Sequence, residues 1–274
     1  MIDLHFHSTF SDGTDTPEAL AALGAANGLT AMALTDHDNT DGCARFAAAA
    51  AEHGIASLTG VELSTDFLGY DIHLLGYGFD LYNATLQEYL EKFRAARTQR
   101  NKEMVRKLND LGCTIKYEDI VQKAGDEDVV GRLHIAVAMA ESGFVREKKE
   151  AFDKYIGTGK RAFVPRFRMT LPEAVQLIRD AKGYPVVAHP QNIGITLKAQ
   201  RSLYKELKQH GLYGLEAYHS EQNKYMTVHF LAIAKEVGLR VTGGSDYHGA
   251  FKPSVKLGVG GGDLRVPDEC FTQF

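Results

Sequence analysis

The sequence has few cysteines and no long apolar run, and each of these absences argues against a class of protein. The three cysteines, Cys43, Cys113 and Cys270, are an odd number without the spacing of a metal-binding cluster. They fit a reduced compartment better than a disulfide framework. No apolar run reaches the roughly 18 residues of a membrane helix, and the first residues lack the charged and apolar segments of a signal peptide. We therefore expect a cytoplasmic protein without membrane association.

An excess of basic charge is also absent. The net charge of -4 argues against a generally basic nucleic-acid-binding protein. The 274 residues are enough for one large domain with an insertion, and the hydrophobic content of 44% is ordinary for a globular chain. Composition alone indicates no function.

The stretch from Ile2 to Gly13 carries the first chemical signal. Its first residues predict a short strand, and His5 and His7, two residues apart, would lie on one face of that strand. Asp12 follows in a Ser-Asp-Gly turn, so a carboxylate lies within one loop of the two imidazoles. This pattern indicates a divalent metal site. Two histidines at this spacing also occur simply as hydrogen-bonded or surface residues.

Strands and helices alternate along most of the chain, and ionisable residues recur where the strands end. We expect further strands at 29–34, 57–63, 70–76, 185–188, 213–218 and 239–242. Helical patterns occupy 17–28, 42–53, 170–183, 198–210 and 224–237. This order is typical of a parallel α/β barrel, whose chemistry lies at the carboxyl ends of its strands. Roughly seven strands fit the pattern, which predicts an irregular barrel.

Residues 81–165 interrupt this alternation and are expected to form an inserted helical subdomain that caps the substrate, between barrel segments 1–80 and 166–274. Its first helix, at 85–111, has an apolar stripe that Arg97 and Arg100 interrupt. These arginines either lie at the edge of the stripe with their heads in water or offer guanidinium groups to phosphate.

Six histidines and three carboxylates collect at the expected strand ends. They are His5, His7, Asp12, His37, Glu62, His73, His189, Asp246 and His248. The absence of cysteine argues against a closed structural zinc site, whereas nitrogen and oxygen donors suit Mn, Fe or Zn in an open catalytic site. Nine ligands exceed the need of one ion, so we expect two or three ions, with Glu62 as the candidate bridge. Such clusters suit phosphate-ester hydrolysis.

Six motifs resemble those of the PHP (polymerase and histidinol phosphatase) family of metal-dependent phosphoesterases. They are DLHFHSTFSDG at 3–13, TDHD at 35–38, GVE at 60–62, IHLLGY at 72–77, AHP at 188–190 and GSDYH at 244–248. The resemblance runs through the expected barrel in order. It implies a distorted (β/α)7 TIM-like barrel that holds two or three divalent ions, with Mn as the first expectation and Fe or Zn as alternatives.

The same resemblance implies how the nine residues divide. His5, His7, Glu62 and Asp246 would hold one ion, and Glu62, His73 and His189 would hold a second. Asp12, His37 and His248 would hold a third ion or contact the substrate phosphate. Some members of the family carry histidine where this chain has Asp12, so the third position stays open. Catalysis would depend on Asp12, His37, Glu62, His189, Asp246 and His248.

The insertion resembles that of family members that act on 3′,5′-nucleoside bisphosphates and short RNA 5′ ends. The resemblance rests on RxxRNK at 97–102, GRLH at 131–134 and AFDKYIGTG at 151–159. Beside Asp12 and His37, it implies that the substrate is bound by Arg97, Arg100, Asn101, Lys102, Arg132, His134 and Thr158. The expected partners are a small nucleotide and short RNA 5′ ends, with no obligate protein partner.

Three functional hypotheses follow. The first is a phosphatase that removes the 3′-phosphate of 3′,5′-nucleoside bisphosphates by direct attack of a metal-activated hydroxide, with 5′-to-3′ trimming of short RNA by the same chemistry. The second is a phosphatase of histidinol phosphate or another small phosphomonoester. The third is a metal-binding barrel without activity, which the intact ligand set argues against. His219, after a strand end, has either a structural role or a role beside the substrate.

Overall fold

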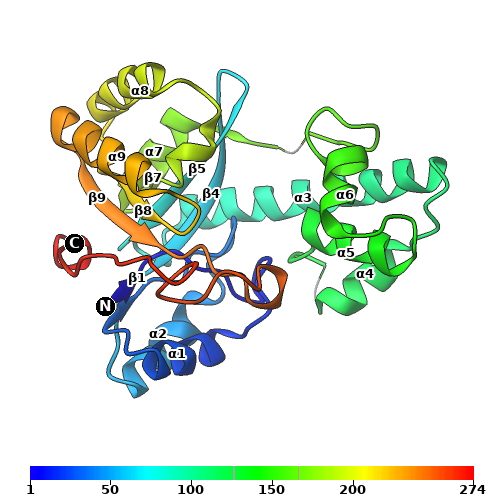
Figure 1. The fold of residues 1–274 in the computed structure, drawn as a ribbon, viewed down its shortest axis with the longest axis horizontal. Coiled ribbons are helices and arrows are strands. Elements are labelled where there is room, and N and C mark those ends of the chain that lie inside the picture. The colour runs from blue at the N-terminus through cyan, green and yellow to red at the C-terminus, as the bar shows by residue number, and fades with distance from the viewer. Residues whose placement is uncertain (126, 166) are drawn as a thin grey trace. The chain divides into compact units, whose positions relative to one another are not determined.

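The computed structural model describes residues 1–125, 127–165 and 167–274. The chain divides into two compact units (Figure 1). One consists of Met1–Glu88 and Arg168–Phe274, and the other of Tyr89–Phe167. The expected start of the second barrel segment, residue 166, lies outside the described residues. None of the helices in the described part of the chain has the length and hydropathy needed to cross a membrane.

The first unit contains two sheets. A parallel sheet has the order β1-β2-β3, and a second sheet has the order β6-β4-β5-β7-β8-β9. The strands are β1 (Ile2–Asp3), β2 (Ala31–Met32), β3 (Ala56–Ser57), β4 (Gly60–Phe67), β5 (Tyr70–Tyr77), β6 (Met169–Thr170), β7 (Tyr184–Val187), β8 (Gly214–His219) and β9 (Arg240–Gly244). This arrangement confirms the α/β class.

Two isolated bridges join the sheets. Phe6 pairs in parallel with Tyr247 beyond the ends of β1 and β9, and His37 pairs in parallel with Glu62 of β4. The N–H of Leu4 also donates to the carbonyl of Gly243, at 3.2 Å. β2 is shorter than the expected 29–34. Phe6 and His37, which follow β1 and β2, make only isolated bridges and do not extend a continuous ladder.

β5 departs from the all-parallel expectation. It runs antiparallel to β4 and to β7, so His73 does not follow the end of a parallel strand but lies within β5. The reason is local, because β4 and β5 form a hairpin. Leu68 and Gly69 at its turn have φ values of 52° and 86°, the combination that a two-residue hairpin turn requires.

Helices follow the strands in the expected order. They are α1 (Pro17–Ala26), α2 (Cys43–Glu52), α7 (Leu171–Asp180), α8 (Leu197–Gln209), α9 (Lys224–Val237) and the short α10 (Glu269–Thr272). The expected capping box is present, because Thr170 and Glu173 exchange hydrogen bonds at the start of α7. α7 buries Val175 and Ile178, so its apolar face contributes to the interior of this unit.

The second unit is helical. Helix α3 (Ala84–Asp110) enters it and is followed by α4 (Tyr117–Ala124), α5 (Arg132–Glu141), α6 (Lys148–Ala151) and a π-helical turn, η1 (Phe152–Ile156). Its described residues contain no strand. Met104, Leu108, Ile135 and Met139 belong to a hydrophobic core within this unit.

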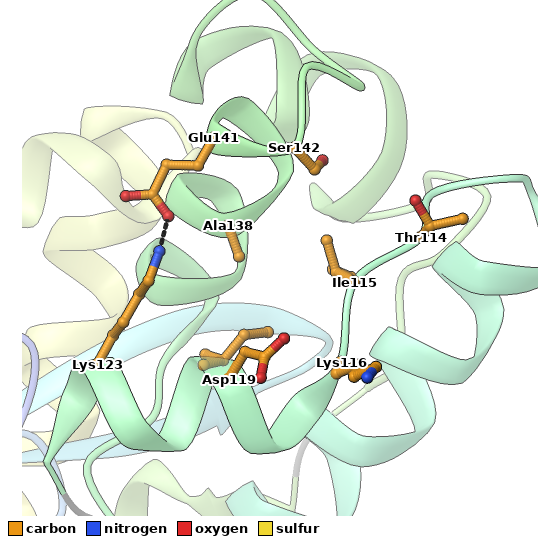
Figure 2. A pocket seen from close by; sticks show the side chains of 9 residues that line it. Thr114, Ile115, Lys116, Asp119, Lys123, Ala138, Glu141 and Ser142 are labelled. Atoms are coloured by element: carbon orange, nitrogen blue, oxygen red, sulfur yellow. Dashed lines mark hydrogen bonds and ion pairs between the residues drawn. The ribbon is translucent and has the colours of Figure 1, made fainter.

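A cleft of 240 Å³ lies in the second unit (Figure 2). It is lined by Thr114, Ile115, Lys116, Asp119, Ile120, Lys123, Ala138, Glu141 and Ser142. Lys123 and Glu141 form an ion pair at its rim. None of the residues expected to bind metal or substrate lines this cleft, so the candidate chemistry lies elsewhere.

Candidate metal centre

The structure brings all nine expected ligand residues together in the first unit. His5, His7 and Asp12 follow β1, and His37 follows β2. The remaining members are Glu62 in β4, His73 in β5, His189 after β7, and Asp246 and His248 after β9. The chain therefore folds residues almost 250 positions apart into one site.

Glu62 is the centre of this arrangement. It is 1% exposed, and its two oxygens face different groups of imidazoles. Oε1 lies 2.7 Å from His73 Nδ1 and 2.9 Å from His189 Nε2. Oε2 lies 3.2 Å from His5 Nε2, 3.2 Å from His7 Nε2 and 3.1 Å from His37 Nδ1. A carboxylate that presents one oxygen to each of two nitrogen groups has the geometry of a bridge between two cations.

Asp246 supplies a second carboxylate beside Glu62. Its Oδ1 lies 3.2 Å from His7 Nε2 and 3.6 Å from His5 Nε2. Its Oδ2 accepts a hydrogen bond of 2.6 Å from Lys252 Nζ. Ligand atoms of His5, His7 and Asp246 all lie within 4.8 Å of one another, which is close enough for one ion to contact all three.

Asp12 belongs to a third group. Its Oδ1 lies 3.3 Å from His248 Nε2, and 3.8 Å from both His37 Nε2 and His7 Nδ1. Ligand atoms of these four residues also lie within 4.8 Å of one another. Two more such groups consist of His37, Glu62 and His73, and of His5, Glu216 and His219. His5, His7 and His37 each belong to two of these groups, so the site can hold more than one cation at short separation.

Two buried polar atoms indicate whether a cation fits this site. Nε2 of His7 and Oδ1 of Asp12 are buried and form no hydrogen bond with any described residue. A buried polar atom without a hydrogen bond is costly. His7 Nε2 faces carboxylate oxygens of Glu62 and Asp246, and Asp12 Oδ1 faces the His248 imidazole. A divalent ion between such atoms would accept a lone pair from each. The nitrogen and oxygen donor set therefore fits divalent metal ions.

The charges of the site also suit a cation. Burial alone would raise the pKa of Glu62, but His37, His73 and His5 hold it well below its usual range. In the same way, Lys252 and His248 hold the pKa of Asp246 well below its usual value despite burial. Both carboxylates are consequently ionised at neutral pH, which is the form that binds metal.

The loop around His37 is held on both sides by its neighbours in the TDHD motif. Asp36 accepts hydrogen bonds from Ser8 Oγ at 2.6 Å and from Ser11 Oγ at 2.5 Å. Asp38 accepts from the backbone N and the Oγ of Ser64, both at 2.8 Å. These two carboxylates therefore fix the position of the imidazole between them.

The backbone is strained at the site. Asp38, His189 and Asp246 have φ values of 49°, 24° and 54° and are three of the five described non-glycine residues with positive φ. Such conformations cost on the order of 1–3 kcal/mol each and persist only where the surroundings enforce them. Their concentration here supports a functional site.

Three residues outside the nine support the site, and two of them, Glu216 and Lys252, were not predicted from the sequence. Glu216 of β8 accepts hydrogen bonds at 2.9 Å from His5 Nδ1 and at 2.6 Å from the backbone N of His189. His219 is 2% exposed, and its Nε2 lies 3.7 Å from Asp246 Oδ2. Lys252 Nζ pairs with the same oxygen, Asp246 Oδ2, at 2.6 Å. His219 was singled out in the sequence because it follows an expected strand end, whereas Glu216 and Lys252 had no such signal.

The expected substrate-binding residues other than Asp12 and His37 all lie in the second unit. Arg97 and Arg100 are only 6% and 7% exposed, which argues against their lying at a solvated helix edge. Arg100 donates to Asn101 Oδ1 at 2.7 Å. Asn101 Nδ2 donates to the carbonyl of Val130 at 2.6 Å. This hydrogen bond connects α3 to the residues just before the first turn of α5.

The other four residues expected to bind substrate have different neighbours. Lys102 pairs with Glu127 at 2.8 Å. The Arg132 guanidinium lies 5.9 Å from the centre of the Phe152 ring. His134 Nδ1 accepts a 3.0 Å hydrogen bond from the N–H of Gly131. Thr158 is exposed.

Comparison with known proteins identifies the family of this chain. The family model of the PHP domain matches residues 3–167. The chain belongs to the PHP domain family. A 5′-3′ exoribonuclease of Haemophilus influenzae is 36% identical to it over 90% of this chain and 89% of the relative. A 3′,5′-nucleoside bisphosphate phosphatase of Chromobacterium violaceum is 33% identical over 90% of this chain and 87% of the relative.

A solved structure supports the same assignment. A protein of Bifidobacterium adolescentis, assigned as a metal-dependent phosphoesterase, superposes with a TM-score of 0.89 at 30% identity. The superposition covers 99% of this chain and 94% of that protein. This PHP-domain chain thus shares its fold with that protein over almost its whole length.

Proposed function

We propose that this PHP-domain protein is a metal-dependent phosphatase that removes the 3′-phosphate from 3′,5′-nucleoside bisphosphates. The observation that carries the proposal is the buried Glu62 carboxylate, with imidazole nitrogens at both oxygens. The named activity of the Chromobacterium violaceum relative supports the substrate class. Hydrolysis of adenosine 3′,5′-bisphosphate to AMP and phosphate would be a representative reaction.

A second activity is 5′-to-3′ trimming of short RNA by the same chemistry. The Haemophilus influenzae relative, which bears the name 5′-3′ exoribonuclease, favours it. In both reactions water attacks a phosphorus and the P–O3′ bond to a 5′-phosphorylated nucleoside breaks. The phosphorus carries the rest of the chain in RNA and no further nucleoside in the bisphosphate. One metal centre could therefore serve both substrates.

The metal ligands are proposed to divide into three sites. His5, His7, Glu62 and Asp246 would hold one ion, and Glu62, His73 and His189 would hold a second. Asp12, His37 and His248 would hold a third ion or contact the substrate phosphate. Manganese is the first candidate, with iron or zinc as alternatives, because all donors are nitrogen or oxygen. Bound divalent ions would activate water and polarise the phosphoryl oxygens.

The chain's own residues would orient the reaction. Glu62, His189 and Asp246 would hold the ions. Asp12 lies beside His37 and His248, and His37 also contacts Glu62, so these three residues would act next to the ions. Arg97, Arg100, Asn101, Lys102, Arg132, His134 and Thr158 are proposed to bind the second phosphate and the sugar. The inserted subdomain, expected at 81–165, would then select the substrate as a cap.

We also propose that the two sheets of the first unit form one distorted (β/α)7 barrel. The pairing of Phe6 with Tyr247 and of His37 with Glu62 supports closure at both junctions. A cytoplasmic location is proposed as well, supported by three cysteines that are all buried and free of disulfides.

The experiment that tests the function is phosphate release from adenosine 3′,5′-bisphosphate in the presence of Mn²⁺, compared with AMP and histidinol phosphate. We expect kcat/KM for the bisphosphate to exceed that for the monoesters by at least about tenfold, or ~1.4 kcal/mol. Equal values for all three substrates would contradict the proposal. His7→Ala, if it folds but hydrolyses none of them, would exclude a binding protein without activity.

A further inference from the structure

Glu216 lies in an irregular part of β8. β8 pairs with β9 in parallel, and the register shifts between Glu216 and Tyr218. Such a bulge inserts an extra residue and changes the side to which the following side chains point. Glu216 and His219 are three positions apart, which in a regular strand would place them on opposite faces. Both are nevertheless buried beside His5.

The two carboxylate oxygens of Glu216 have different partners. Oε1 accepts from Nδ1 of His5 at 2.9 Å, and Oε2 accepts from the backbone N–H of His189 at 2.6 Å. The residue is 0% exposed. His5 and His189 belong to different proposed ion sites, so this single side chain is bonded to a ligand residue of each.

The contact with His5 determines which ring nitrogen can bind metal. A carboxylate only accepts hydrogen bonds, so Nδ1 of His5 must carry the proton that it donates. Nε2 is then left with a free lone pair, and it is this atom that lies 3.2 Å from Glu62 Oε2 and 3.6 Å from Asp246 Oδ1. Carboxylates commonly fix metal-ligating histidines in this way.

The contact with His189 acts on the backbone. His189 has a φ of 24°, outside the range that residues other than glycine normally adopt. The hydrogen bond from its N–H to Glu216 is one of the contacts that can hold this conformation. Its ring meanwhile presents Nε2 to Glu62 Oε1 at 2.9 Å. A shift of the backbone here would move that nitrogen.

We propose that Glu216 is a positioning residue that sets the His5 tautomer and the His189 backbone together, and thereby couples the two ion sites that share Glu62. The inference rests on the proposed function, because it takes His5 and His189 as metal ligands. It adds a residue outside the nine that the sequence motifs supply.

Glu216→Gln tests the proposal sharply. The backbone N–H of His189 can only donate, so the single amide oxygen of glutamine must face it. The amide NH₂ then faces His5 Nδ1 and donates to it, which moves the imidazole proton to Nε2 and blocks the metal-binding nitrogen. We expect the affinity for Mn²⁺ or Zn²⁺, measured by chelator competition, to fall about 10–100-fold.

Two further measurements separate positioning from general stability. Long-range ¹H–¹⁵N NMR of the zinc-loaded protein should show the His5 proton on Nδ1 in the wild type, and this signal should be lost in Glu216→Gln. Tyr204→Phe is the matched control, since it removes a buried 2.8 Å hydrogen bond to Gln200 in the same unit. It should lower the melting temperature without changing metal affinity.

The possible outcomes can be told apart. If the wild type binds no divalent ion, the proposed function fails and the inference fails with it. If the wild type binds ions, His7→Ala loses them and Glu216→Gln keeps wild-type affinity, the inference alone is overturned.

Loss of one full equivalent of metal at saturation in Glu216→Gln would also overturn the inference, because Glu216 would then be a ligand, together with His5 and His219. Should Glu216→Gln not fold, Glu216→Asp retains both oxygens on a shorter side chain, and unchanged affinity there would refute positioning.

Discussion

Among single residues, Glu62 has the most demanding environment. A buried carboxylate is normally unfavourable unless it is paired. Here five imidazole nitrogens lie at 2.7–3.2 Å from its oxygens. In the metal-free protein these imidazoles stabilise the charge, and in the proposed loaded protein cations would take over that role.

Replacement of this carboxylate should affect both proposed ions at once. We expect Glu62→Gln to lower metal affinity by more than the ~10–100-fold that loss of a supporting contact causes. Metal analysis after dialysis against a chelator of known strength measures this. Glu173→Gln, which alters only the exposed cap of α7, serves as the control. Two equivalents of metal still bound to Glu62→Gln at wild-type affinity would rule out the bridge.

The stability of the metal-free protein should depend on pH through His7. Burial alone would lower the pKa of this imidazole, but contacts with Asp246 and Glu62 raise it from 6.5 to about 9. A raised pKa means that the folded state binds the proton more tightly than the unfolded state. The stabilisation of the folded state by protonated His7 is therefore complete below pH 6.5. It is lost as the pH rises through about 9.

Urea unfolding of the chelated protein at pH 6 and pH 9.5 checks this. The wild type should lose more stability between the two pH values than His7→Asn, in which the titrating ring is absent. A difference that is the same in both proteins would show that His7 does not titrate in this range. The comparison must be made without metal, because a bound ion would displace the proton.

At the scale of elements, the absence of a side chain at Gly244 of β9 lets the segment after β1, at His5, pack closely against β9. A Cβ at this position would lie 2.3 Å from the backbone N of His5 and 2.4 Å from its Cβ. We expect Gly244→Ala to destabilise the protein by about 1–3 kcal/mol and to weaken metal binding, because His5 must move. Gly261→Ala is the matched control, since nothing lies within 4 Å of its added methyl group. Equal unfolding free energies for the two variants would contradict this.

The elements also show what sequence patterns can and cannot predict. His37, His189 and Asp246 could be grouped from the sequence because each follows an apolar strand that the local pattern identifies. The α/β class is confirmed. The direction of β5 was wrong, because alternating apolar residues do not reveal which way a strand runs. Glu216 was missed, because a bulge changes the side of a strand without leaving a mark in a single sequence.

The molecule as a whole consists of two units with separate interiors. The second unit has a hydrophobic core around Met104 and Ile135, and the buried arginines of α3 belong to it. A buried arginine needs hydrogen-bond acceptors, and Arg100 has Asn101 as one of them. The sequence could place these arginines on an apolar stripe but could not tell burial from a solvated edge, since both have the same helical period.

The two arginines should matter for the bisphosphate more than for simple esters. A charge-assisted hydrogen bond contributes about 1.5–3 kcal/mol, so Arg97→Ala or Arg100→Ala should raise KM for adenosine 3′,5′-bisphosphate by on the order of tenfold or more. KM for AMP should change little. Steady-state kinetics, with circular dichroism to confirm folding, measures both values.

Arg106→Ala is the control for this comparison. Arg106 lies on the same helix but is exposed and paired with Glu103 and Asp110, each at 2.8 Å. It should leave both KM values unchanged. If Arg97→Ala and Arg100→Ala raise KM equally for the bisphosphate and for AMP, these arginines do not recognise the second phosphate.

The contact between β1 and β9 has a consequence for the order of events during synthesis. Phe6 pairs with Tyr247, and the N–H of Asp246 donates to the carbonyl of His5 at 2.7 Å. A ribosome translates His5 and His7 some 240 residues before Asp246 and His248. The two histidines therefore leave the ribosome well before these partners do. Metal capture by the complete donor set would then follow the synthesis of the strands between them rather than nucleate folding.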